Sequence, residues 1–349
     1  MTDEQEHGPT PPAEPPRRRP VGRWLLLAAL LVLIIVLVAP LVWPIPPLQD
    51  TMSNDALTAG KGGLLPIDGL DVFYQRAGST SADCNIVLLH GFGASTFSWR
   101  DTLPDLGARC NVVAFDRPGF GLSDRPLAEE WAADENPYST SYSADLTIKL
   151  MDALGMQRAV IVGHSAGASV AILAAARYPD RVSALILEAP AVLDVGRPVP
   201  DWAEPILRTP QMRRIGPLLA RRIAASGTDD IVRDSFYDRS LATDEVIAGY
   251  RAPLRVDDWD RALWEYTIAP RTEIDKELLG ELDMPVIVIK PTEDRIVDLQ
   301  QQGRVAAMIR GAQLVELADA GHVGHEELPA AFESIVFRFI DDLQEAGVP

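Results

Sequence analysis

The chain has 349 residues, 47% of them hydrophobic, and a formal net charge of −18. This length suits one large domain or two ordinary ones with a sizeable core. The acidic balance argues against a nucleic-acid partner, because binding to phosphates needs a basic face.

The first 23 residues are polar and rich in proline, and we predict a disordered tail there. From Trp24 to Trp43 no residue is charged, and these 20 residues would span about 30 Å as a helix, the thickness of a hydrocarbon core. The run follows four arginines: Arg17, Arg18, Arg19 and Arg23. Only Lys61 follows it within 20 residues. We predict a single-pass anchor in the cell membrane, residues 24–43, with a cytoplasmic N-terminus and an extracytoplasmic remainder.

The alternative interpretation of this apolar run is a cleaved signal peptide. Such a peptide usually has a shorter apolar region, and a small-x-small cleavage site follows it. Neither feature is present before Pro44. We therefore favour the anchor and predict that residues 44–63 form a linker.

Beyond the linker, apolar strands alternate with helices over residues 64–190 and again over residues 273–349. The predicted strands cover residues 70–75, 85–89, 111–115, 159–162, 182–187, 286–289 and 313–317. This alternation predicts an α/β fold with a mostly parallel sheet and helices on both faces. Sites in such sheets form at the carboxyl ends of the strands.

Residues 163–167 read Gly-His-Ser-Ala-Gly, between a predicted buried strand and a predicted helix of small residues. A G-x-S-x-G pattern in this context is typical of a nucleophile elbow, in which glycines permit a sharp and strained turn. We predict that Ser165 is a nucleophile. The N–H of Ala166, at the start of the helix, would donate to an oxyanion.

Four motifs together resemble those of the α/β-hydrolase superfamily, over about residues 64–345. They are His90-Gly91-Phe92-Gly93, the segment 116–124, the elbow, and Gly321-His322 followed by Glu327-Leu328-Pro329. The resemblance implies the α/β-hydrolase fold with a helical cap inserted after the sixth strand. Residues 90–100 resemble the lipase and esterase branch, which includes membrane-anchored monoacylglycerol lipases and bacterial lipases. C–C bond hydrolases and cofactor-free haloperoxidases share much of the pattern.

A serine nucleophile needs a base within hydrogen-bond reach. The chain has five histidines: His7, His90, His164, His322 and His325. The first lies in the tail, the second shapes its loop by resemblance, and the third is inside the elbow. The superfamily places its base at the position of His322, which we predict as the base, while His325 supports the loop.

The acid that orients the imidazole is expected after the strand 286–289. Asp294 matches the position of the superfamily's acid, although Pro291 stands where glycine is usual. The alternative is an acid after the preceding strand, either Glu188 or Asp194. With Asp294 the order along the chain is serine, aspartate, histidine, which is the order of this fold.

The resemblance also implies a second oxyanion donor, the N–H of Phe92, and a structural role for residues 116–124. The spacing His322-x-x-His325-Glu326 raises the possibility of a zinc site. It lacks the helical HExxH spacing, and the serine mechanism already accounts for His322. We therefore predict no metal and no cofactor.

Residues 191–272 lose the strand–helix rhythm, and we predict a cap whose helices are broken by prolines, Pro217 among them. Weak candidates for an acyl pocket are Trp202, Ile206, Leu207, Trp259 and Trp264. Residues 208–222 carry five arginines and no acidic residue: Arg208, Arg213, Arg214, Arg221 and Arg222. One hypothesis is that this patch rests on an anionic membrane surface. The alternative is a solvated face paired with local acids.

The two cysteines, Cys84 and Cys110, each lie six residues before a strand-end marker, His90 and Asp116 respectively. In this fold the two strands are parallel neighbours, so the cysteines would lie level. A disulfide is compatible with that placement and with an extracytoplasmic location. The alternative is two buried thiols.

These features predict a serine hydrolase that cleaves carboxylic, lipid-derived esters through an acyl-enzyme. Its partners would be a small-molecule ester and the lipid membrane, with no nucleic acid. Two alternatives stay open. One is C–C bond hydrolysis or perhydrolysis on the same residues, and the other is a non-catalytic ligand-binding protein on the same fold.

Overall fold

The computed structural model describes residues 21–58, 60–127, 131, 135–193, 201–270, 272 and 274–348. Residues 1–20 of the predicted disordered tail (residues 1–23), and Asp194, an alternative acid, lie outside these ranges. The last three residues of that predicted tail are helical, because α1 begins at Val21. The chain divides into two units, Met1–Pro44 and Ile45–Pro349. In the first unit, α1 (Val21–Val42) includes the 20-residue run Arg23–Val42, which is long and apolar enough to cross a membrane by length and composition alone.

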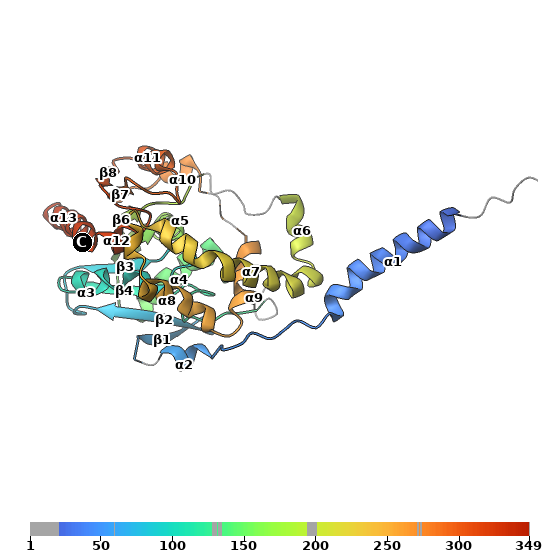
Figure 1. Ribbon diagram of the computed structural model, residues 1–349. Helices are drawn as coiled ribbons and strands as arrows, with labels where there is room; N and C mark the ends of the chain where they lie inside the picture. Colours follow the sequence, from blue (N-terminus) through green and yellow to red (C-terminus); the bar gives the residue numbers. More distant parts are fainter. Residues whose placement is uncertain are drawn as a thin grey trace, which may run out of the picture. The chain divides into compact units, whose positions relative to one another are not determined.

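The second unit is built on one eight-stranded sheet in the order β1-β2-β4-β3-β5-β6-β7-β8 (Figure 1). The strands are β1 Gly63–Ile67, β2 Leu70–Ala77, β3 Asn85–Leu89, β4 Asn111–Phe115, β5 Ala159–His164, β6 Val182–Glu188, β7 Val286–Pro291 and β8 Gln313–Leu317. β1 and β2 pair antiparallel, β2 joins β4 antiparallel, and the pairs from β4 to β8 are parallel. This sheet confirms the predicted fold class.

Helices cover both faces of the sheet (Figure 1). The helices of the second unit are α2 Asn54–Thr58, α3 Thr102–Leu106, α4 Thr140–Ala153, α5 Ala166–Arg177, α6 Glu204–Leu207, α7 Pro210–Ser235, α8 Asp244–Arg251, α9 Trp259–Ile268, α10 Lys276–Gly280, α11 Leu299–Met308, α12 Gly324–Glu327 and α13 Pro329–Glu345. Alternate residues of a strand enter opposite cores: Val87 belongs to the core that includes residues of α4, α5 and α11, and Leu88 to the core that includes residues of α3 and α13. Burial on both faces explains why the parallel strands read as continuous apolar runs.

Part of the predicted linker is ordered against the domain. Strand β1 begins at Gly63, and α2 lies within residues 44–63. Met52 forms an isolated bridge with Val256, donating its N–H to the Arg255 carbonyl at 2.9 Å. No apolar period marks this stretch, so the sequence alone did not indicate these contacts.

The segment between β6 and β7 contains α6 to α10, and one of its helices differs from prediction. The sequence predicted a break at Pro217, but α7 runs 26 residues through it. An internal proline removes one backbone hydrogen bond. Beside it, Gly216 lets the indole of Trp264 on α9 approach closely, since a Cβ there would lie 2.2 Å from the ring. Packing against α9 thus holds the helix together.

A disulfide joins Cys84 and Cys110, whose Cα atoms are 4.9 Å apart. The register of β3 and β4 places Asn85 opposite Asn111. The two cysteines therefore lie level at the starts of parallel neighbouring strands.

Candidate active site

Ser165 sits at the tip of a strained turn between β5 and α5. Its backbone has φ 52° and ψ −118°, in a region that residues with a Cβ rarely adopt. The turn is held from both sides, because the Ser165 N–H donates to the Glu188 carbonyl at 2.9 Å and the Ser165 carbonyl accepts from the Ala191 N–H at 3.2 Å. Backbone strain of this kind persists only where the surroundings fix it, and it is frequent at functional sites.

The two glycines of the elbow have no room for a side chain. A Cβ on Gly163 would lie 2.7 Å from the Gly167 carbonyl oxygen, and a Cβ on Gly167 would lie 2.3 Å from the Leu89 carbonyl oxygen. The helix and strand therefore meet at backbone contact distance. This close approach explains why both positions of the elbow pattern are glycine.

His322 lies in the loop after β8, and Asp294 in the loop after β7. The His322 Nδ1 and an Asp294 carboxylate oxygen are 2.9 Å apart. Asp294 also accepts from the N–H groups of Ile296 and Val297 and from the Gln302 amide at 2.8 Å. Burial raises the pKa of Asp294, but the His322 contact and the two backbone donors outweigh burial and hold the pKa below its ordinary value. An ionised Asp294 places the proton on Nδ1 and leaves Nε2 as an acceptor.

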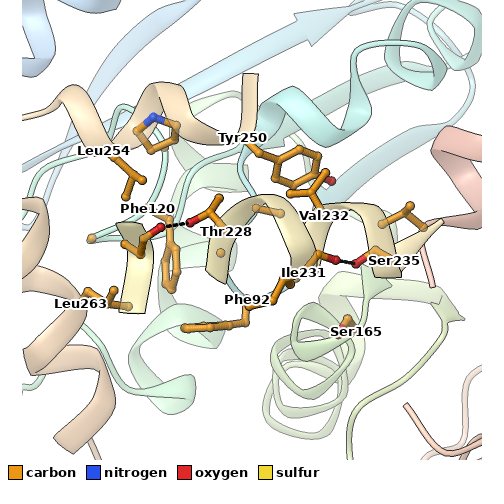
Figure 2. A pocket seen from close by; sticks show the side chains of 18 of the residues that line it. Phe92, Phe120, Ser165, Thr228, Ile231, Val232, Ser235, Tyr250, Leu254 and Leu263 are labelled. Carbon is orange, nitrogen blue, oxygen red and sulfur yellow. Dashed lines mark hydrogen bonds between the residues drawn. The ribbon is translucent and has the colours of Figure 1, made fainter. Parts of the chain in front are cut away.

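Ser165 and His322 border one cavity of about 220 Å³, and Figure 2 shows Ser165 among the side chains that line it. Its floor comes from the strand ends and includes Phe92 and Phe120. Its roof comes from the segment between β6 and β7: Ile223, Ala224, Thr228, Ile231, Val232, Ser235, Phe236, Tyr250, Pro253, Leu254, Trp259 and Leu263. The roof is mostly apolar, and its hydroxyls at Thr228 and Ser235 donate to carbonyls of their own helix at 2.8 Å.

The N–H groups of Phe92 and Ala166 flank the serine. Within the described part of the chain, neither donates to a protein acceptor. Ala166 is the first residue of α5, where the helix dipole favours negative charge. The loop of Phe92 comes close to the elbow, since a Cβ on Gly91 would lie 3.1 Å from the Ser165 Cβ. Both amides are therefore free to donate, and their role as oxyanion donors stays a prediction.

The loop after β3 is fixed by a buried arginine. Arg117 donates from one guanidinium nitrogen to the carbonyls of His90 and Gly91, at 3.1 and 3.2 Å. The His90 Nε2 accepts the Arg117 backbone N–H at 3.1 Å. Asp116 accepts from the N–H groups of Thr96 and Leu122, and burial raises its pKa to about 6. These residues fix the loops that form the floor of the cavity. The side chains of His90, Asp116 and Arg117 do not themselves line it.

Glu188, an alternative acid in the sequence analysis, does not contact His322. Its carboxylate instead accepts the His325 backbone N–H at 2.8 Å and pairs with the His325 Nδ1 at 2.7 Å. The strand end directs Glu188 behind the base and not towards it. The alternative prediction that Glu188 is the acid paired with His322 is therefore wrong.

The two histidines of the His322-x-x-His325 spacing face different carboxylates, so they do not form one metal site. Within the described residues, His164, Glu188 and His325 each place a possible ligand atom within 4.8 Å of the others. The Glu188 oxygens are already engaged by His325.

The predicted pocket residues were mostly wrong. Of the five candidates only Trp259 lines the cavity. Trp264 is buried against α7, while Trp202 is 75% exposed and Ile206 51% exposed. The signal for the actual roof was the spacing of four residues along α7, from Ala224 to Thr228 to Val232, which places them on one helix face. The sequence does not say which face turns to the cavity.

The arginine-rich stretch makes local contacts. Arg221 pairs with Asp260 at 2.6 Å, and Arg213 lies 3.7 Å from Glu265. Arg208 donates to a backbone carbonyl in α9 at 3.2 Å. These contacts favour the interpretation that this face is paired with local acids.

Comparison with known proteins gives the following matches. The alpha/beta hydrolase fold family matches residues 85–329. The uncharacterized hydrolase YugF of Bacillus subtilis (strain 168) is 26% identical over 275 residues, which cover 78% of this chain and 96% of YugF. The 2-hydroxymuconate semialdehyde hydrolase of Pseudomonas sp. (strain CF600) is 28% identical over 277 residues, which cover 75% and 89%. Among solved structures, the meta-cleavage product hydrolase CumD from Pseudomonas fluorescens IP01 has a TM-score of 0.63 and 26% identity, over 80% of this chain and 98% of CumD.

Proposed function

Because the chain belongs to the α/β-hydrolase family, we propose that it is a serine hydrolase that cleaves esters of apolar carboxylic acids through an acyl-enzyme. One observation supports this above the others. The strained Ser165 borders the same cavity as His322, whose Nδ1 lies 2.9 Å from the buried Asp294. A nucleophile, a base and an orienting acid in this arrangement are suited to acyl transfer.

The proposed reaction runs in two halves. In the first, the Nε2 of His322 takes the proton of the Ser165 hydroxyl as the oxygen attacks the ester carbonyl. The N–H groups of Phe92 and Ala166 stabilise the oxyanion, and the imidazolium then returns the proton to the departing alcohol. In the second half His322 deprotonates a water, which attacks the acyl-enzyme carbonyl, and the imidazolium returns the proton to the Ser165 oxygen as the acid is released. Asp294 stays ionised and stabilises the imidazolium.

The cavity favours a neutral, apolar acyl group. The hydroxyls of Thr228, Ser235 and Tyr250 bond to the protein itself, that of Tyr250 by donating to Glu326. Among the described residues that line the cavity, Arg125 is the only lysine or arginine. Both of its terminal nitrogens donate to backbone carbonyls, at 2.8 to 3.2 Å. A cavity of about 220 Å³ is small for a ligand site, which suits acyl chains of short to medium length.

We also propose that the protein is a single-pass membrane protein with its catalytic domain outside the cytoplasm. Support comes from the apolar run Arg23–Val42, the arginines before it and the Cys84–Cys110 disulfide, which persists in oxidising compartments. In this arrangement residues 64–190 and 273–349 form the hydrolase core and residues 191–272 the cap. Lipid-derived esters held in the same membrane would be natural substrates. Protease added outside intact cells should digest the domain, and protection of the domain would contradict this topology.

The test is labelling of the full-length protein in detergent with a fluorophosphonate probe, together with turnover of p-nitrophenyl esters of increasing chain length. We expect wild type to label and to hydrolyse the esters, and Ser165→Ala to do neither. Ser169→Ala is the matched control, because Ser169 lies one turn further along the same helix and donates to the Ala191 carbonyl at 3.1 Å. A wild-type protein that neither labels nor turns over would contradict the proposal and favour a non-catalytic binding protein.

A second candidate is C–C bond hydrolysis. It is suggested by two relatives that match most of the chain, the 2-hydroxymuconate semialdehyde hydrolase and the meta-cleavage product hydrolase CumD. A further relative, the 2-hydroxy-6-oxo-6-phenylhexa-2,4-dienoate hydrolase of Comamonas testosteroni, is named for an anionic substrate. The engaged terminal nitrogens of Arg125 argue against such a substrate here. Loss of the dienoate absorbance at a rate matching ester turnover would reverse this preference.

A further inference from the structure

A second histidine–carboxylate pair lies directly behind the first. His325 is fully buried, and its ring Nδ1 lies 2.7 Å from Glu188. The other Glu188 oxygen accepts the His325 backbone N–H at 2.8 Å. One carboxylate therefore fixes both the main chain and the side chain of a residue three positions after His322.

The elbow histidine links this pair to the base. The His164 Nε2 lies 2.9 Å from the carbonyl oxygen of His322. Its ring centroid is 4.8 Å from those of both His322 and His325. The main chain of the base is thus held by a ring that belongs to the nucleophile turn.

The other end of the network reaches the wall of the cavity. Glu326 accepts from Arg100 at 2.5 Å and from the Tyr250 hydroxyl. Tyr250 lies on α8 and lines the cavity (Figure 2). The short helix α12, which follows His322, is therefore tied on one side to the end of β6 and on the other to the cavity wall.

Each member of this network is costly to disturb. The side chains of Glu188, His325 and Glu326 have no exposed surface. Removal of one partner leaves a buried donor or acceptor without compensation. The same cost makes the network rigid, so the loop has one preferred position, and a displacement of the base by about 1 Å can cost about 10²-fold in rate.

We propose that Glu188 and Tyr250 are positioning residues for His322: Glu188 acts through His325, and Tyr250 acts through Glu326. This inference rests on the proposed hydrolase function. Neither residue touches the reacting atoms. Tyr250 also lines the cavity, so it connects the cavity wall to the loop that carries His322. A group bound against Tyr250 would therefore affect the position of that loop.

The first test replaces Tyr250 by phenylalanine, which keeps the ring in the cavity wall and removes the donor to Glu326. We expect kcat per fluorophosphonate-titrated site to fall about tenfold, with KM within twofold of wild type. Tyr138→Phe is the matched control, because its buried hydroxyl also donates, to the Pro126 carbonyl at 2.7 Å, away from this network. The control should keep kcat within twofold.

The second test is Glu188→Gln, which keeps an acceptor for the His325 N–H and removes the carboxylate from Nδ1. We expect a larger fall in kcat per titrated site, about 30-fold, again with little change in KM. If either variant loses thermal stability or titratable sites while kcat per site stays within twofold, the role is structural and the inference fails. If wild type itself does not label with the probe, the proposed function fails instead.

Discussion

The floor and the roof of the cavity are built on opposite principles. The floor stands on strand ends, and its polar groups are fixed by buried hydrogen bonds, as with Asp294 and His322 at 2.9 Å. The roof is one face of α7 with parts of α8 and α9, and its hydroxyls at Thr228 and Ser235 bond to their own helix. Under the proposed function, reaction chemistry would belong to the floor and selection among acyl groups to the roof.

The largest effect that would sharpen this comparison is expected at the acid of the floor. Asp294→Asn should lower kcat about 10⁴-fold with little change in KM, because the amide no longer holds the imidazole in the productive tautomer. Steady-state ester hydrolysis measures it. Asp298→Asn is the control: Asp298 caps α11 through the Gln300 and Gln301 N–H groups and should keep kcat within twofold. Equal losses in both variants would sink the assignment of Asp294.

A second prediction concerns the backbone of the floor. In Gly167→Ala the new Cβ would lie 2.3 Å from the Leu89 carbonyl oxygen, so we expect a loss of about 3 kcal/mol in the free energy of unfolding, measured by denaturant titration. Gly303→Ala in α11 is the matched control. No atom lies within 4 Å of its Cβ, and the change should be neutral or stabilising by about 1 kcal/mol. If the free energy of unfolding of Gly167→Ala equals that of wild type, the elbow can shift to accept a side chain and the prediction is wrong.

The third prediction is that the free energy of unfolding depends on pH through the buried histidines behind the floor. Burial lowers the pKa of His164 to about 3 and that of His325 to about 4. Below pH of about 6.5 the unfolded chain therefore binds more protons at these histidines, and stability falls as the pH falls. Glu188 acts in the opposite direction: burial raises its pKa to about 7, so its contribution grows as the pH falls from about 7 to about 4.5.

His164→Gln isolates one histidine from this balance. Between pH 6.5 and pH 5 wild type should lose about 2 kcal/mol more stability than the variant, because only wild type retains the ring that must stay neutral. Urea titrations of both proteins at the two pH values measure the difference. Parallel losses in the two proteins would show that His164 does not carry this term.

The smallest effect is expected in the roof. Val232→Trp should narrow the cavity and lower kcat/KM about tenfold for long p-nitrophenyl esters relative to the acetate, with little change in kcat for the acetate. Ile206→Trp is the control, since Ile206 is 51% exposed and does not line the cavity. A uniform loss for all chain lengths in Val232→Trp would break the division between floor and roof.

The sequence indicated the floor well because its signals are local. Apolar runs predicted the parallel strands, and the fold class is confirmed. The glycines of the elbow were interpretable from sterics alone, and Asp294 and His322, which the resemblance to the superfamily implied as acid and base, lie in contact. The interpretation of the elbow depends on a few neighbouring residues, and the expectation that the loops after β7 and β8 meet near it depends on the rule that parallel strands end at one edge.

Other features were decided by contacts between distant parts of the chain. Pro217 does not break α7, because Trp264 packs against the adjacent glycine. Glu188 pairs with His325, 137 positions away, although both motifs were visible separately.

By itself, then, the sequence determined the order of the strands' motifs, the turn at Ser165 and the residues that follow the strand ends. These depend on backbone sterics and the alternation of apolar residues, which act over short distances along the chain. Only the tertiary structure decided which face of α7 closes the cavity and which carboxylate meets which histidine. The physical reason is that burial and hydrogen-bond partners are properties of packing between segments, and a helix face or a carboxylate has no fixed partner until those segments meet.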